Sequence, residues 1–70
     1  MKIIYRVTVE ADGQEPEIME YDEADRGGAV AYYNNSIGLE GVYLVYLDKV
    51  TWDEETQHST IVPLERSEAR

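Results

Sequence analysis

Residues 42–52 of this 70-residue chain are V-Y-L-V-Y-L-D-K-V-T-W. The first six are aliphatic or aromatic, and neither glycine nor proline interrupts the stretch. Branched and ring side chains keep their preferred rotamers in an extended backbone, so the composition favours a strand. Alternation would place Tyr43, Val45 and Leu47 on one face and Val42, Leu44 and Tyr46 on the other. Because both faces are apolar, we predict the central strand of a small sheet, covered on at least one side.

Length and composition limit what the protein can be. Seventy residues allow one domain, and a chain of this size buries only about 60% of its unfolded surface. The absence of cysteine excludes disulfide bonds and cysteine-based metal or catalytic sites. A homodimer or a tight partner complex would supply further buried area. Residues 1–10 lack a signal-peptide core, and no apolar run approaches the ~20 residues of a membrane span. We expect a soluble, cytoplasmic protein.

Charge is the strongest compositional signal. Fifteen Asp and Glu against six Lys and Arg give a formal net charge of −9. Such a surface repels phosphate backbones and anionic membranes. We therefore expect no direct binding to nucleic acid or membrane, and a basic protein surface as the natural partner.

Residues 2–10 alternate between apolar and polar side chains, which predicts a half-buried strand. The Asp-Gly pair at residues 12–13 indicates a hairpin turn, because both residues tolerate positive φ. A second strand is predicted over residues 15–21. Pro16 cannot donate a ladder hydrogen bond and places that strand at an edge of the sheet.

The register of this first hairpin stays open. A two-residue turn would pair Val7 with Ile18. A loop one residue longer would instead bring Met19 and Tyr21 onto the face of Val7, and the two registers exclude each other.

Residues 22–35 predict the helix. Asp22 can cap it, Asp25 lies in the capping-box position, and Glu23 favours the positive helix N-terminus. A helical wheel groups four small residues on one face: Ala24, Gly27, Gly28 and Ala31. This face would let the helix lie close to the sheet. Alternatively, the two glycines, which cost about 1 kcal/mol each relative to alanine, leave the helix loose enough to adjust to a ligand.

Residues 57–64 predict a fourth strand after a polar turn, with Leu47 opposite Val62 and Val45 opposite Leu64. Pro63 again suggests an edge. Residues 65–70 have no apolar anchor and are expected to fray. The chain is thus predicted to be one compact domain, residues 1–64, followed by a frayed tail, residues 65–70.

The expected fold class is α+β with the element order β-β-α-β-β. A right-handed crossover passes the helix over one face of the sheet. We predict a four-stranded antiparallel sheet in spatial order 2-1-3-4 with one helix packed on one face.

Eight acids without an intervening Lys or Arg are the main candidate binding residues: Glu10, Asp12, Glu15, Glu17, Glu20, Asp22, Glu23 and Asp25. They fall on the first hairpin and the helix entrance, so we expect one negative patch. The patch could serve solubility and edge protection, recognition of a basic protein, or a cation site. Duplex DNA carries one charge per ~1.7 Å, whereas an extended strand here reaches one per ~7 Å, which tempers a DNA-mimic interpretation.

The second turn carries Asp53, Glu54, Glu55 and His58. Carboxylates and imidazole can bind divalent metals, but the spacing matches no calcium loop, which favours a solvated turn. His58 is the sole histidine, and no serine has a nucleophile context. We expect no enzyme activity, no cofactor and no metal.

The aromatic residues are six tyrosines and one tryptophan, with no phenylalanine. These rings could cap a thin core, or they could form a contact surface, since tyrosine combines an apolar ring with a polar tip. Tyr32 and Tyr33 point about 100° apart on a helix, so both should not be fully buried. The candidate anchors are Tyr21, Tyr32, Tyr33 and Trp52.

Four features together resemble small acidic bacteriophage proteins that disable host enzymes: V-T-V-E-A-D-G at residues 7–13, the acidic run at 16–25, the small-residue helix, and V-Y-L-V-Y-L at 42–47. Such proteins include the phage inhibitor of bacterial RNA polymerase, the anti-CRISPR proteins, and the DNA-mimic inhibitors of uracil-DNA glycosylase and restriction enzymes. The resemblance implies stoichiometric binding in the host cytoplasm rather than turnover.

We therefore expect a non-catalytic acidic interaction module that occupies a basic or nucleic-acid-binding surface of a host protein. The alternative is a structural module that self-associates through a sheet face or edge. A small metal-binding protein is a third interpretation.

Overall fold

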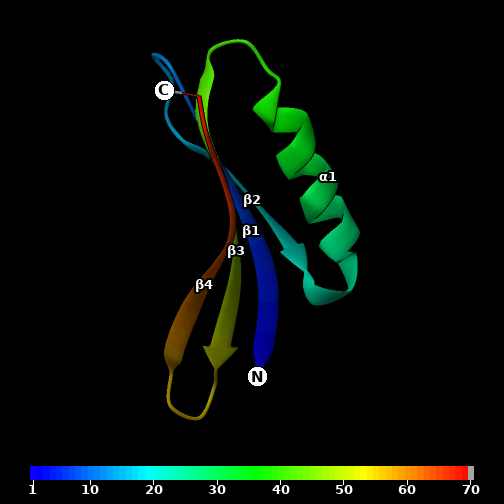
Figure 1. The fold of residues 1–70 in the computed structure, drawn as a ribbon. Helices are drawn as coiled ribbons and strands as arrows, with labels where there is room; N and C mark the ends of the chain where they lie inside the picture. The colour runs from blue at the N-terminus through cyan, green and yellow to red at the C-terminus, as the bar shows by residue number, and fades with distance from the viewer. Residues whose placement is uncertain (70) are drawn as a thin grey trace.

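A computed structural model describes residues 1–69 of the chain. Within them, four antiparallel strands form one sheet in the order β2-β1-β3-β4, with a helix packed against it (Figure 1). The elements are β1 (Lys2–Ala11), β2 (Glu17–Asp22), a 3₁₀ turn η1 (Glu23–Asp25), α1 (Arg26–Ile37), β3 (Val42–Asp53) and β4 (His58–Glu68). The predicted α+β class, element order and strand order are confirmed.

The core lies between α1 and the two central strands. Val7 of β1 and Val45 of β3 are almost completely buried, and Leu47 lies beside them. The register pairs Val7 with Leu47 and Val9 with Val45, so these side chains share one face of the sheet. The stretch 42–52 is therefore a central strand, as predicted.

The helix covers this core with a face different from the predicted one. The buried helical residues are Ala29, Tyr33 and Ser36, at the i, i+4, i+7 spacing of one helix face. Ala24, Gly27 and Ala31 are exposed and Gly28 is half-buried, so the predicted small-residue contact is wrong. A buried tyrosine ring removes far more apolar surface from water than the small residues could.

The start of α1 also differs from the prediction. Residues 23–25 form η1, and α1 begins at Arg26. Neither Asp22 nor Asp25 makes a side-chain capping hydrogen bond, so the predicted caps are wrong. Arg26 instead places its guanidinium 5.7 Å from the ring centroid of Tyr5, which holds the first turn of α1 against β1.

We expect Gly27→Ala to raise the free energy of unfolding by about 1 kcal/mol, because a Cβ there meets no atom within 4 Å and alanine favours the helix. Gly28→Ala is the matched control and should gain less, since its Cβ would lie 2.7 Å from the Asp25 carboxylate. Urea unfolding followed by circular dichroism measures both. A destabilised Gly27→Ala would show that the helix requires its loose geometry.

The first hairpin adopts the longer of the two candidate loops. Val7 pairs with Met19 and Tyr5 with Tyr21. Gly13 has a φ of +72° and Asp12 has no positive φ, so the two-residue turn that needs both does not form. Tyr21 therefore faces the core side of the sheet.

The second hairpin differs from the predicted register. Leu47 lies opposite Glu65 and Val45 opposite Ser67, instead of Val62 and Leu64. The loop lies one residue later in the chain than predicted, which moves the β4 partners of β3 by two residues. Asp53 accepts the amides of Glu55 and Thr56 in this loop, and Gln57 takes a φ of 59°. An irregularity beside Leu47 adds a further residue to β4.

This register carries β4 beyond the predicted end of the domain. β4 continues to Glu68, and the Ala69 amide donates to the Tyr43 carbonyl at 2.9 Å. The prediction of a frayed tail from residue 65 is therefore wrong for residues 65–68. Residue 70, the last of the predicted tail, lies outside the described residues.

A β-bulge changes the face of Tyr43. The register shifts between Glu10 and Ala11, so Ala11 pairs with Val42 while Glu10 pairs with Leu44. Val42 packs against the core, and the Tyr43 hydroxyl instead lies 3.4 Å from Glu10 on the open face, the side of the sheet without the helix. The predicted assignment of these two side chains to faces is therefore reversed.

Candidate functional site

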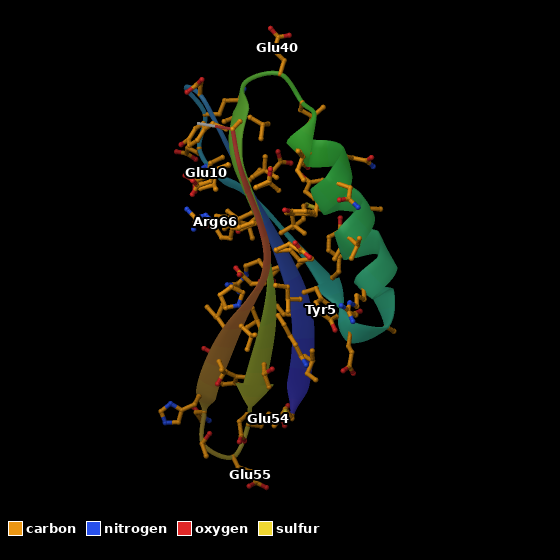
Figure 2. The ribbon with its side chains drawn as sticks, in the orientation of Figure 1. Tyr5, Glu10, Glu40, Glu54, Glu55 and Arg66 are labelled. Carbon is orange, nitrogen blue, oxygen red and sulfur yellow. The ribbon has the colours of Figure 1, made fainter. Side chains whose placement is uncertain are left out.

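Acidic side chains gather at the end of the molecule formed by the β1–β2 turn and the α1–β3 loop. The Asp12 amide donates to the Gly41 carbonyl at 3.0 Å and ties the two connections together. This brings Glu40 beside the predicted acids of the first turn. Glu10 and Glu40 lie in the same half of the molecule, and Glu54 and Glu55 lie at the opposite end (Figure 2). We call the set Glu10, Asp12, Glu15, Glu17 and Glu40 the acidic end.

A cleft of about 160 Å³ opens within the acidic end. Glu15, Glu17 and Glu40 line it, together with the hydroxyl-bearing side chains of Tyr32 and Ser36. Its apolar wall comes from Val9, Leu39 and Val42. Within residues 1–69, none of the three glutamates forms an ion pair with Lys or Arg. The cleft therefore combines uncompensated carboxylates with an apolar wall.

The environment of the cleft changes the pKa of Tyr32. Burial raises the pKa of its phenol, and the negative charge of Glu17 and a hydrogen bond to that carboxylate raise it further. The phenol therefore stays protonated and can donate to Glu17. The Ser36 hydroxyl donates to the Tyr32 carbonyl at 2.8 Å, which fixes the buried side of the cleft.

The other predicted acids extend away from this end along β2. Asp22 pairs with Ile4, five strand positions from the Glu17–Val9 pair, a distance of about 17 Å. Glu20 accepts from Arg6 Nε at 2.9 Å, so its charge is compensated. Glu23 and Asp25 lie in η1. The eight acids thus follow the β2 edge, and only four of them belong to the acidic end.

The predicted aromatic anchors are distributed over different environments. Tyr21 and Tyr32 form a half-exposed pair beside Glu17, with ring centroids 6.3 Å apart at 47°. Tyr33 is only 7% exposed and packs in the core, so its prediction as a contact residue is wrong. Trp52 is 38% exposed, at the end of the sheet far from the cleft. As predicted, Tyr32 and Tyr33 are not both buried.

Comparison with protein-family models, with curated proteins and with solved structures gave no match. No helix in residues 1–69 is long and apolar enough to cross a membrane. The candidate site consequently depends on geometry and charge alone.

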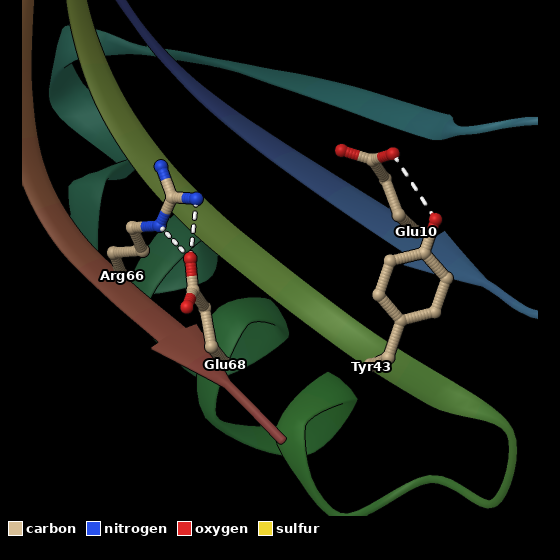
Figure 3. Close-up of polar contacts among 4 residues, drawn as sticks. All are labelled: Glu10, Tyr43, Arg66 and Glu68. Atoms are coloured by element: carbon tan, nitrogen blue, oxygen red, sulfur yellow. Dashed lines mark hydrogen bonds and ion pairs between the residues drawn. The ribbon is translucent and has the colours of Figure 1, made fainter. Parts of the chain in front are cut away.

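The open face adds two polar contacts near the acidic end (Figure 3). Arg66 Nε donates to Glu68 Oε1 at 2.7 Å, and the same side chains form an ion pair. The Tyr43 hydroxyl donates to Glu10 at 3.4 Å. The compensated carboxylate of Glu68 therefore adds little to the local negative potential.

Sequence reasoning missed Glu40, and no local signal could have found it. Its loop reaches the first turn only because β1 and β3 pair and the Gly41 carbonyl accepts the Asp12 amide. Gly41, with a φ of +86°, lets the loop reverse at that point.

The Asp53 side chain stabilises the second turn. Asp53 Oδ1 lies 3.0 Å from the Glu55 amide and 3.5 Å from that of Thr56. In the described part of the chain, no group of three or more His, Asp or Glu side chains is arranged to hold a metal ion. The geometry therefore gives Asp53 a turn-stabilising contact.

We expect Asp48→Asn to raise stability at neutral pH. Asp48 lies on the open face opposite Arg6, and burial raises the pKa of its carboxyl, although the Arg6 charge opposes the rise. An acid with a raised folded-state pKa binds more protons when folded, so its contribution to stability is lost as pH rises from the usual value of 3.8 through the folded value. The asparagine variant should lack that loss in a pH series of urea unfolding curves. An unchanged pH profile would contradict the burial effect.

Proposed function

We propose that this protein is a non-catalytic interaction module whose acidic end binds a basic or nucleic-acid-binding surface of another protein. The observation that carries the proposal is the cleft, because three glutamates that have no ion-pair partner among residues 1–69 lie around its apolar wall. The net charge of −9 supports attraction of a basic partner from a distance.

The cleft fits one kind of partner group, a lysine or arginine side chain. The apolar wall of Val9, Leu39 and Val42 would cover the methylene stem, and Glu15, Glu17 and Glu40 would accept from its cationic head. The Tyr21–Tyr32 pair beside the cleft would supply aromatic contact area. Recognition would thus involve a few charged points.

The spacing of the acidic side chains along β2 supports this interpretation over close mimicry of a DNA backbone. Along β2, alternation separates same-face side chains by about 6.6 Å, and Glu20 is already paired with Arg6. Duplex DNA presents a charge every ~1.7 Å. The resemblance to acidic phage inhibitors suggests a host enzyme as the partner and the host cytoplasm as the location.

The test is affinity capture from a bacterial lysate at low salt, followed by elution with increasing salt. We expect a basic protein that elutes as ionic strength rises, because exposed charges more than ~10 Å apart are screened at 0.1 M salt. A capture that is insensitive to salt, or that retains no protein, would sink the proposal.

Self-association is the second candidate function, and β4 favours it. Ile61, Val62 and Leu64 on this edge strand are 53%, 44% and 37% exposed. An exposed apolar edge can pair with another strand. Sedimentation velocity of the isolated chain tests this candidate, and a monomer at high micromolar concentration would remove it.

A further inference from the structure

An apolar patch lies at the end of the sheet opposite the acidic end. Val50 pairs with both Ile4 and Ile61, so these three side chains share the open face. Trp52 lies two residues beyond Val50 on the same face and is the diagonal neighbour of Ile61. We call Ile4, Val50, Trp52 and Ile61 the distal patch.

The distal patch is uncovered within the described chain. Helix α1 packs on the other face of the sheet, and the β3–β4 hairpin extends beyond the helix (Figure 1). Val50 is buried by its neighbours, whereas Trp52 and Ile61 remain 38% and 53% exposed. An exposed tryptophan beside an aliphatic side chain has the composition of an interface centre.

The charges around the patch select the kind of partner. The turn beyond Trp52 contributes Glu54 and Glu55, which lie at the tip of the hairpin (Figure 2). Asp22 lies opposite Ile4 on the other side. Among residues 1–69, Lys2 lies opposite Trp52, and Arg6, two residues from Ile4 on the same face, is already paired with Glu20. A second copy would bring an acidic rim against an acidic rim, which costs binding energy.

We propose that the distal patch binds a protein segment that presents an apolar side chain flanked by lysine or arginine. Trp52 and Ile61 would contact the apolar group, and the acids at the rim would contact the flanking cations. This surface is separate from the acidic end, so the protein has two binding surfaces, one at each end of the sheet.

Trp52 gives a direct readout, because it is the only tryptophan in the chain. The probe is the peptide Lys-Lys-Leu-Leu-Lys-Lys, titrated against the whole protein while tryptophan emission is recorded. We expect a saturable blue shift as leucine displaces water from the ring. Lys-Lys-Ser-Ser-Lys-Lys and Glu-Glu-Leu-Leu-Glu-Glu should give no shift, because each lacks one of the two complementary features.

A matched pair of variants locates the contact. Ile61→Ser should lower the affinity for the leucine-lysine peptide about tenfold, which corresponds to a loss of about 1.4 kcal/mol of binding free energy. Ile18→Ser is the control, since Ile18 is 55% exposed on the same face but on β2. It should leave the affinity unchanged, and circular dichroism checks that both variants are folded.

Three results would overturn the proposal: no shift with the leucine-lysine peptide, an equal shift with either control peptide, or equal weakening by Ile61→Ser and Ile18→Ser. None of them bears on the cleft, because the Trp52 emission reports only the distal patch. Replacing Glu15, Glu17 and Glu40 with glutamine should leave this shift in place, so the two surfaces fail or succeed independently.

Discussion

Leu47→Ala should lower the free energy of unfolding by about 2–5 kcal/mol, because it removes a buried side chain and leaves a cavity beside Val7. Leu47 is only 3% exposed and lies in the central strand, where few atoms can move to fill the space. A domain of this length has a total stability of about 3.5–10 kcal/mol. The variant should therefore be largely unfolded at 37 °C or lose well over 10 °C in melting temperature.

Leu39→Ala is the control for this prediction. It is the same substitution at a residue that is 59% exposed, and it should change stability by less than about 0.5 kcal/mol. Thermal and urea unfolding of both variants gives the comparison. Equal losses at the two positions would contradict the placement of the core.

The triple reversal Glu15→Lys, Glu17→Lys and Glu40→Lys should lower the affinity for the captured partner by about 100-fold. Each exposed ion pair contributes up to about 1 kcal/mol, and three such contacts correspond to about two orders of magnitude in affinity. The variant should remain folded, because the three carboxylates have no ion-pair partner within residues 1–69.

The control for the reversal has the same net charge. Glu23→Lys, Asp25→Lys and Glu65→Lys change the total charge by the same amount away from the cleft and from the distal patch. This variant should lose much less affinity for the captured partner, measured by surface plasmon resonance at two salt concentrations. Equal losses in both triple variants would mean that the total charge of the protein decides binding, and the cleft would have no special part.

The arrangement of the elements follows from local patterns that tertiary contacts do not override. Strong alternation in β1, the apolar run of β3 and the helical stretch between β2 and β3 determine the β-β-α-β-β order. The strand order follows because a short hairpin joins β1 to β2 and a helix carries the chain back to the free side of β1.

Registers and helix contacts were harder to predict, because single residues decide them. One side chain, Asp53, holds a turn that lies one residue later than predicted, which moves the β4 partners by two residues, and a bulge beside Leu47 adds a third. As a result Ile61 and Val62 move toward the hairpin tip, away from the helix. On α1, the ring of Tyr33 competes with the small residues for the sheet, and the larger area gained by the ring decides the outcome.

The candidate site was only half visible in the sequence. The acids of the first turn are consecutive enough to suggest a patch, but Glu40 joins them through β1–β3 pairing across more than thirty residues. The hairpin register decides whether Glu17 lies on the same side of the sheet as Tyr32, and the Asp12-Gly13 pair leaves that register open. Local sequence patterns do not indicate such long-range pairing.

The two ends of the chain leave the sheet at opposite poles: β1 starts beside the β3–β4 turn, and β4 finishes beside the α1–β3 loop (Figure 1). A bulky fusion attached before residue 1 would therefore block access to Trp52 but leave the cleft accessible. A fusion attached after β4 would have the opposite effect. The choice of tethering point can consequently mask either pole in turn, without a single amino-acid substitution.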